Sequence, residues 1–465
     1  MSQKTLMGGN SILKIVKVNA VILMLAIVGT SFCACGKDPD ATATSTTAAT
    51  TTTTSATTEE ETTTTDPSEL NEMDIEDVDD DTEDEKILIW TSSNSFKTLL
   101  SNYTDVDYEI VVMDANTYQT RLDQVLATGE GAPDLFVCEY DYADKYMYSE
   151  YTLSVNELGI SYDELDDMYD YTLYYACDGE NVVKGLTWEA YPSAVIYNRD
   201  VAEEYLGVRE PEDVAPFFAD WGSFQTMATE LSIASEGSVR AVSGIDDVWR
   251  SYTYNRTDPW NIEGSVTVDS AALEFLGFAT DLYDNNCSFM TSQFDGDWFD
   301  NMANDSVLSY WGPSWLINML KAESPYDKFG VVRAPTDFAW GEHWIMASCY
   351  CDMRASAAQI MRDLTLNEEN LLDMADDGTF VNSESIMAEY AADETQTFSC
   401  LDGQNPYSVF DEAARSIEST HTVCHEQVYN DAFIDLAYGF VQGDIDSEDD
   451  FITAYEEELE ARGLN

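Results

Sequence analysis

Aromatic rings and carboxylates lie close together at two places in the chain. Trp188 and Glu189 precede a short apolar run, and Glu139 and Asp141 follow another. An aromatic ring can cover an apolar patch of a sugar while a carboxylate accepts hydrogen bonds from its hydroxyl groups, so such pairs suit a polar ligand with apolar patches. The alternative for the first pair is a core tryptophan beside a surface glutamate.

Three potential metal ligands, His421, Cys424 and His425, have a spacing that would place them on one face of a helix. No fourth ligand is evident, and surface or core roles are the simpler interpretation. The sequence also has no phosphate-binding loop of the Walker type and no nucleophile elbow. We therefore expect no metal, no cofactor and no catalytic residue.

The elements that must position these side chains begin with an alternation of strands and a helix. Because strand and helix alternate, we expect a parallel sheet covered on both faces, with ligands gathering at the carboxyl ends of its strands. The polar residues at those ends include Ser93, Asn94, Glu139 and Asp141. The predicted elements are strands at 86–90, 108–113 and 134–138 and a helix on which Tyr118, Leu122, Val125 and Leu126 share a face.

The stretch GLTWEAYPSAVIYNRD at 185–200 contains a further strand. Its apolar run is Ala194 to Tyr197, and Pro192 stands at the start, where no backbone donor is missed. We expect Asp220 to cap a helix that follows.

Tryptophans recur in the second half of the chain, at transitions from strand to loop. They indicate either a cleft lined by rings or a large core with tryptophan as filler. The residues concerned are Trp249, Trp260, Trp311, Trp315 and Trp344.

The net charge is -68, from 21 basic and 89 acidic residues. Such a chain repels nucleic acid and anionic lipid headgroups, so we expect neither as a partner. The charge fits a solubility trait, and it leaves open the attraction of a cationic ligand.

The N-terminus is typical of an export signal, with three lysines before the apolar run Ala20–Val28. Ala34, Cys35 and Gly36 resemble the lipobox of bacterial lipoproteins, although Phe32 stands where that pattern usually has leucine. We expect a lipid on Cys35 to be the sole attachment to the membrane. The Thr-rich and then acidic segment that follows predicts a disordered stalk up to residue 85.

Several motifs together resemble the extracellular solute-binding lipoproteins of ABC importers, in the maltose-binding-like family 1. The resemblance covers essentially all of residues 86–465. It rests on the stretch ending in YNRD, the helix start at Asp220, YWGPSW at 310–315, FGVVRAP at 329–335, and QNPYSVF at 404–410.

This resemblance implies an α/β fold of the type II periplasmic-binding-protein kind, with two lobes of sheet and flanking helices joined by hinge segments. The division it implies is a signal peptide at 1–34, a lipidated stalk at 35–85, lobe 1 at 86–192 and 347–395, and lobe 2 at 193–346 and 396–465. The lobes would close over a ligand without chemistry.

Carried over to this chain, the resemblance suggests Asp141 and Glu189 as sugar-contacting acids and Trp315 as the stacking ring. Extra residues after Glu189 and at Ser314 depart from the family pattern, and Trp311 could take the role given to Trp315. The expected partners are a carbohydrate and the permease subunits of an importer, for a monomer on the outer face of the cell membrane. Two rival interpretations are a receptor for polyamines or other cations and, less favoured, an anchored glycoside hydrolase using Glu139, Asp141 and Glu189.

Overall fold

Five short strands form the first sheet. They are β1 (Ile87–Thr91), β2 (Tyr108–Val112), β3 (Leu135–Glu139), β4 (Gly185–Leu186) and β11 (His343–Ala347). The computed structural model describes residues 70–75, 77–80, 86–262, 264–323, 327–418 and 422–464. The strand order is β2-β1-β3-β11-β4. β1 is parallel to β2 and β3, as the sequence predicts, whereas β11 is antiparallel to β3 and β4.

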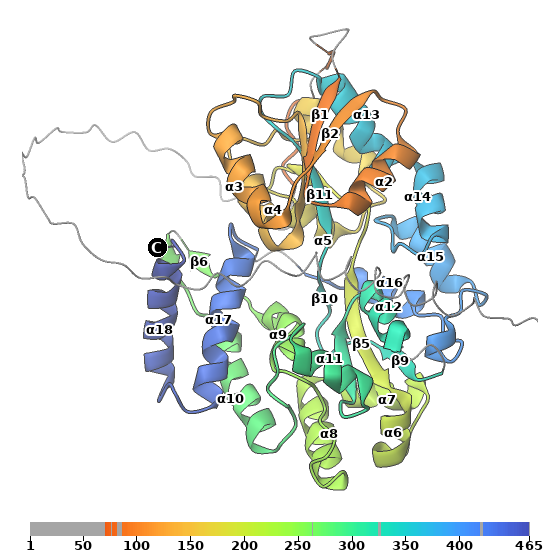
Figure 1. Cartoon of the computed structure of the whole chain (residues 1–465), viewed down its shortest axis with the longest axis vertical. Coiled ribbons are helices and arrows are strands. Elements are labelled where there is room, and N and C mark those ends of the chain that lie inside the picture. Colours follow the sequence, from red (N-terminus) through yellow and green to blue (C-terminus); the bar gives the residue numbers. More distant parts are fainter. Residues whose placement is uncertain are drawn as a thin grey trace, which may run out of the picture.

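Helices flank this sheet and complete the first lobe (Figure 1). Ser93 caps the first of them by accepting a hydrogen bond from the backbone of Phe96, and the predicted apolar face at Tyr118, Leu122 and Leu126 is buried. The helices are α2 (Asn94–Tyr103), α3 (Ala115–Leu126), α4 (Tyr140–Met147), α5 (Asp170–Tyr175), α13 (Arg354–Thr365), α14 (Glu368–Asp376) and α15 (Glu384–Ala392).

The second sheet is built around β5 (Pro192–Asn198), which starts at Pro192 as predicted. Its partners are all antiparallel, namely β8 (Ser309–Gly312), β9 (Phe329–Val332) and β10 (Phe338–Ala339). Alternate residues of β5 face two different cores, because side chains of a strand point to opposite faces. Ala194 and Ile196 join the core shared with the first lobe, and Val195 and Tyr197 join the core of the second lobe.

The helices of the second lobe lie below the first lobe in Figure 1. Asp220 caps α8 as predicted, accepting a hydrogen bond of 2.8 Å from the backbone of Ser223. These helices are α6 (Arg199–Leu206), α7 (Pro211–Val214), α8 (Trp221–Ala234), α9 (Asp246–Tyr252), α10 (Ser270–Asp284), α11 (Gly296–Ala303), α12 (Ser314–Glu323), α17 (Glu426–Val441) and α18 (Glu448–Ala461), beside the hairpin of β6 (Asn261–Ile262) and β7 (Ser265–Val266). α16 (Tyr407–Ala414) packs against both α15 and β5.

The chain crosses between the two sheets at 187–191, from β4 to β5, and at 340–342, from β10 to β11. The predicted lobe boundary after residue 346 is therefore displaced. β11 belongs to the first sheet because its backbone pairs with β3 from His343 opposite Glu139 to Ala347 opposite Leu135. The division implied by the resemblance places residues 343–346 of this strand in the second lobe, and that placement is wrong, because the pairing of a strand depends on residues far away in the sequence.

Residues 70–75 and 77–80, which we call the N-terminal strap, lie against the first lobe. The backbone of Met73 donates to the side chain of Asn156 at 3.0 Å. Asp80 accepts hydrogen bonds from the backbone and the hydroxyl group of Ser356 at 2.9 and 2.6 Å. The prediction of disorder up to residue 85 was wrong for the strap, because acids that repel one another also satisfy free donors at a helix N-terminus.

The strap provides a first testable prediction. α13 has no capping hydrogen bond from its own N-cap side chain, and Asp80 supplies one from outside. We expect Asp80→Ala to lower the free energy of unfolding by about 1 kcal/mol, the usual value of an N-cap. Urea denaturation measures the change. Asp79→Ala, which removes the same charge from an exposed neighbour, is the control, and equal midpoints for the two variants would contradict the assignment.

The potential metal ligands do not share a helical face. α17 begins at Glu426, so Cys424 and His425 precede it, and His421 lies outside the described residues. Within the described part of the chain no three His, Cys, Asp or Glu side chains form a metal-binding group, and none of its helices has the length and apolarity to span a bilayer. The export signal, Cys35 and the stalk up to residue 69 also lie outside the described residues.

Candidate functional site

The two crossing segments hold each other through reciprocal hydrogen bonds. Glu189, on the first segment, accepts the backbone N–H of His343 at 3.1 Å and contacts its Nδ1 at 2.6 Å. Glu342, on the second segment, accepts the backbone N–H of Tyr191 at 2.9 Å. The Tyr191 hydroxyl group donates to Glu189 at 2.8 Å, and that of Tyr171 donates to Glu342 at 2.9 Å. We call this arrangement the hinge clasp.

Burial makes the hinge clasp electrostatically unusual. Glu342 is only 1% exposed, and this burial, together with the nearby charge of Glu189, raises its pKa to about 7. Burial alone would lower the pKa of His343. The negative charge of Glu189 and its hydrogen bond outweigh this effect, and Glu139 and Glu342 act in the same direction as Glu189, so the pKa of the imidazole is raised. The hinge clasp thus favours the protonated form of an imidazole that lies among carboxyl groups where the lobes join.

The first lobe contributes polar groups at the carboxyl end of β3, as the sequence predicts. β3 ends at Glu139 and α4 begins at the next residue, which leaves Asp141 exposed in the first turn of the helix. Ser92 donates to Glu139 at 3.0 Å. Burial raises the pKa of Glu139. The side chain of Asp141 reaches solvent, but the protein around it still displaces part of its hydration and raises its pKa, while the nearby charges of Arg250 and His343 oppose the rise.

The second lobe contributes aromatic rings and a cation. The Arg250 guanidinium lies 4.1 Å from the ring centroid of Trp340, a cation–π contact. Trp315 is half-buried and meets Trp340 edge to face at 4.8 Å. It also lies against Gly341, whose φ of +102° is rarely adopted by other residues and whose missing side chain leaves room for the Trp315 ring.

Charged groups of the two lobes influence each other across the gap. Burial raises the pKa of Asp431, on α17, to about 6, and Asp141 of the first lobe adds to the rise while Arg250 opposes it. The hydroxyl groups of Tyr140 and Tyr254 also meet across the lobes at 3.4 Å. We define the inter-lobe site as Glu139, Asp141, Glu189, Arg250, Trp315, Trp340, Glu342, His343 and Asp431.

Several residues predicted from the sequence lie in or beside this site. Glu139, Asp141, Glu189 and Trp315 belong to it, and the α2 start with Ser93 and Asn94 follows Ser92, which bonds Glu139. Trp188 lies behind it, only 4% exposed, with its ring stacked on His343 at 6.0 Å. The pair therefore fits neither a ring and carboxylate open to a sugar nor a core tryptophan beside a surface glutamate. Both side chains are buried at the hinge.

Four predicted tryptophans lie in packed interiors instead. Trp311 and Trp249 belong to the core of the second lobe, where Trp249 stacks on Phe433 at 4.5 Å. Trp344 stacks on Tyr175 in the first lobe at 5.1 Å. Trp260 is buried and donates to Glu426. Each of these rings is occupied by protein neighbours, so we leave all four out of the proposed ligand contacts.

Arg250, Trp340, Glu342, His343 and Asp431 were not predicted. The loop WGEHW at 340–344 carries three of them, and its two rings flanking an acid and a histidine were the available signal. Arg250 lies in a stretch without regular pattern and Asp431 on an ordinary acidic helix, so nothing local distinguished them.

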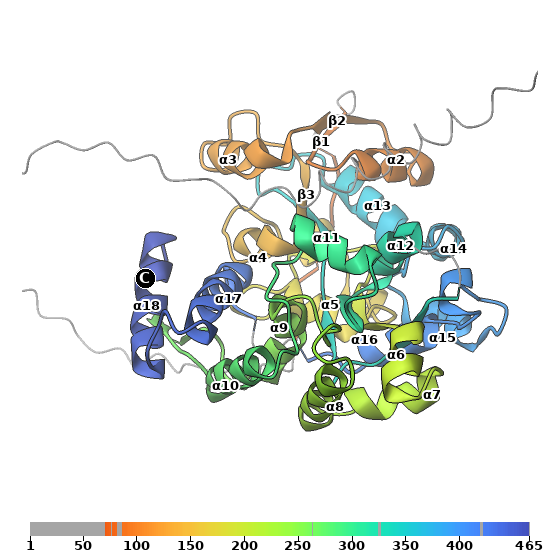
Figure 2. The ribbon, with the colours of Figure 1, turned by 60° about the horizontal axis from the view of Figure 1, so that its bottom comes forward.

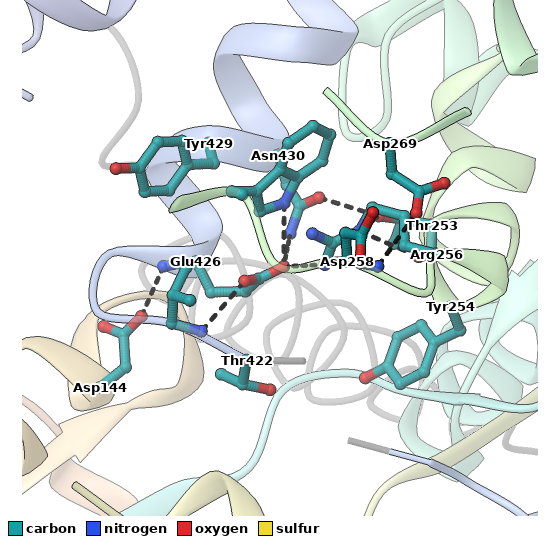
Figure 3. Close-up of polar contacts among 12 residues, drawn as sticks. Asp144, Thr253, Tyr254, Arg256, Asp258, Asp269, Thr422, Glu426, Tyr429 and Asn430 are labelled. Atoms are coloured by element: carbon teal, nitrogen blue, oxygen red, sulfur yellow. Dashed lines mark hydrogen bonds and ion pairs between the residues drawn. The ribbon is translucent and has the colours of Figure 1, made fainter. Parts of the chain in front are cut away.

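A second polar cluster joins the lobes beside the inter-lobe site (Figure 3). Glu426, at the start of α17, forms a buried ion pair with Arg256 and accepts hydrogen bonds from the indole of Trp260 and the amide of Asn430, at 3.0 and 3.1 Å. Its backbone N–H donates to Asp144 of α4 at 2.7 Å. A small cavity of about 220 Å³ lies elsewhere, between α3 and α4, and no residue of the inter-lobe site lines it.

No protein-family model and no curated protein matches this chain. Solved structures do match. An extracellular solute-binding protein family 1 structure has a TM-score of 0.72 and 17% identity, covering 81% of this chain and 99% of its own. The ABC transporter associated binding protein of B. animalis subsp. lactis, in complex with beta-1,6-galactobiose, has a TM-score of 0.61 and 17% identity, covering 81% and 97%.

A third structure is the galacto-N-biose-/lacto-N-biose I-binding protein of the ABC transporter from Bifidobacterium longum, with lacto-N-biose. It has a TM-score of 0.63 and 15% identity, covering 83% of this chain and 100% of its own. At these identities the likeness establishes the fold, which is the two-lobe α/β fold of extracellular solute-binding proteins, as the sequence predicts.

Proposed function

We propose that this chain is the solute-binding component of an ABC importer and that it captures a carbohydrate between its two lobes. The observation that carries the proposal is the inter-lobe site itself, to which both lobes and both crossing segments contribute. Carboxylates beside an accessible aromatic ring, here the half-buried Trp315, are groups that bind sugars. The fold, shared with proteins that bind galactobiose and lacto-N-biose, supports the same ligand class.

The proposed mechanism is binding without chemistry. A ligand that touches Glu139 and Asp141 on one lobe and Trp315 on the other favours closure, because only the closed arrangement offers both sets of contacts. We further propose that Ser93 and Asn94 at the start of α2 contribute to the first set, and that Trp188 and Glu189 act from behind it at the hinge.

The proposal extends to the cellular setting. A lipid on Cys35 would hold the chain on the outer face of the cell membrane, where a monomer would deliver its ligand to the permease subunits. Retention of the protein in the detergent phase, lost on Cys35→Ser, tests the anchor.

A cationic ligand such as a polyamine is the second candidate. The observation that favours it is the pairing of Asp141 and Asp431, acids from opposite lobes whose charges oppose each other. A cation between them would relieve that repulsion, and its affinity would fall steeply with salt.

A thermal-shift screen of the purified protein against oligosaccharides, polyamines and amino acids tests these proposals. A ligand that binds only the folded protein at 100 times its Kd adds about 2.7 kcal/mol of stability. We expect a shift with one series of sugars and no turnover of the sugar bound. A shift with polyamines alone would replace the ligand class, and release of shorter sugars would favour the hydrolase.

Trp315→Ala should then weaken the binding of that sugar by about tenfold or more, since it removes the most accessible of the rings in the site. Isothermal titration measures the change. The matched control is Tyr283→Ala. It removes an exposed ring of α10 that belongs neither to the inter-lobe site nor to the hinge clasp. Equal loss in both variants would contradict the site.

A further inference from the structure

The N-terminus of α17 is capped by a side chain of α4, which belongs to the other lobe. The N-terminus of α17 lacks a capping side chain of its own, because His425 at the N-cap position has a φ of 67° and makes no capping hydrogen bond. The cap comes from the other lobe, where Asp144 accepts the first backbone N–H of the helix at 2.7 Å. One carboxyl group therefore spans the boundary between the lobes (Figure 3), and α4 packs against α17 around it.

Asp144 is deeply buried, at 1% exposure. Figure 2 shows α4 and α17 beside each other, with α4 belonging to the first lobe and α17 to the second. If the lobes separate, Asp144 loses the Glu426 N–H and gains water. Any change in the ionisation of this group thus changes the balance between the joined and the separated arrangement.

The groups that face Asp144 are mostly acids or neutral side chains. Lys145, the next residue along α4, directs its ammonium group to Asp123 instead. The facing groups are Asp141 and Tyr148 on α4, Tyr175 on α5, Cys138 on β3, and Cys424 and Glu426 at the start of α17.

We propose that the contact between Asp144 and the N-terminus of α17 is an inter-lobe latch, which a proton on Asp144 tightens. Removal of the carboxyl group from water, together with the charges of Glu426 and Asp141, disfavours its ionised form while the latch is shut. Both carboxyl oxygens of Asp144 accept a backbone N–H, one from Glu426 at 2.7 Å and the other from Lys145 at 2.5 Å. These two bonds favour the ionised form, and burial outweighs them. The neutral form keeps the oxygen that accepts the Glu426 N–H, weakens only the bond from Lys145 within α4, and does not repel the neighbouring acids.

The direction of the pH effect follows from linkage. With the latch shut, burial raises the pKa of Asp144 to about 7, and with the lobes apart the pKa returns toward the ordinary value of about 4. The shut state therefore binds the proton more tightly. Acidification from about pH 7 to about pH 4 favours it by up to tenfold per pH unit, and above pH 7 no further loosening is expected.

Hydrogen exchange at the start of α17 tests the latch in the full-length protein without added ligand. We expect the protection of the peptide over 422–432, corrected for the intrinsic pH dependence of exchange, to be up to about fiftyfold higher at pH 5 than at pH 7. A parallel fall in the radius of gyration, measured by X-ray scattering, would show that the lobes draw together.

Two substitutions of Asp144 should have opposite effects. Asp144→Asn imitates the protonated side chain and should keep high protection at both pH values. Asp144→Ala removes the acceptor and should give low protection at both. Asp80→Asn is the control, because it alters an outside cap within one lobe and should leave the pH dependence intact.

Protection in the wild-type protein that does not change between pH 5 and pH 7 would overturn the latch. So would the same pH dependence in Asp144→Asn as in the wild type, because other acids would then be responsible. Neither result would affect the proposed function, which the ligand screen tests separately.

Discussion

Replacement of Glu426 by alanine is expected to lower the free energy of unfolding by about 3–5 kcal/mol. The main cause is Arg256, which would remain in the interior without its partner. Both side chains of the Glu426–Arg256 ion pair are less than a tenth exposed, so the substitution leaves an uncompensated guanidinium in the interior. The indole N–H of Trp260 and the amide of Asn430 lose their acceptor as well. Chemical denaturation followed by tryptophan fluorescence measures the effect.

Glu210→Ala is the matched control for this prediction. Glu210 also pairs with a buried arginine, Arg199, but its own side chain is 52% exposed, and Arg199 keeps hydrogen bonds to the carbonyl groups of Phe329 and Leu401. We expect a loss of less than about 1 kcal/mol. If the two variants are destabilised equally, burial is not what makes the Glu426 pair important.

Replacement of Trp311 by alanine should cost about 3–5 kcal/mol of stability, through loss of burial and the cavity left behind. Its ring is fully buried, stacked on Trp221 at 5.7 Å and meeting Phe224 edge to face at 5.4 Å. Thermal unfolding, monitored by circular dichroism, checks the value.

Trp315 provides the contrast, four residues further along the same motif. Because its ring is half-buried, Trp315→Ala should cost clearly less stability than Trp311→Ala while it weakens ligand binding. In the reverse pattern, Trp311→Ala would remain stable but bind the ligand poorly. That result would favour the alternative that Trp311, and not Trp315, stacks on the ligand.

The comparison of these two tryptophans shows what local pattern can establish. Strands, the cap at Asp220 and the strand start at Pro192 were predicted correctly, because propensity and backbone chemistry act within a few residues. Whether a tryptophan fills a core or faces a ligand depends on what lies opposite. Trp311 and Trp315 share a motif and differ only in their long-range neighbours.

The predictions for the N-terminal strap and for β11 were wrong for related reasons. The acidic composition of residues 70–80 indicates disorder, yet Asp80 meets a helix N-terminus that is 276 positions away in the sequence. The apolar run of β11 predicts a strand. Its partner β3 lies far away in the sequence, so no local pattern identifies the pairing. The same holds for the site, since Arg250 and Asp431 acquire their importance only from Asp141 of the other lobe.

The hinge clasp has a mechanical consequence. Each crossing segment contributes a glutamate that bonds the backbone of the other, so neither can bend alone without breaking a bond within a buried site. The two segments should therefore bend as one strip, and the lobes should rotate about a single axis along it instead of twisting independently. Rotation about that axis should then be the easiest closing motion, and the residues of the hinge clasp, which lie on the axis, should influence which faces of the lobes meet.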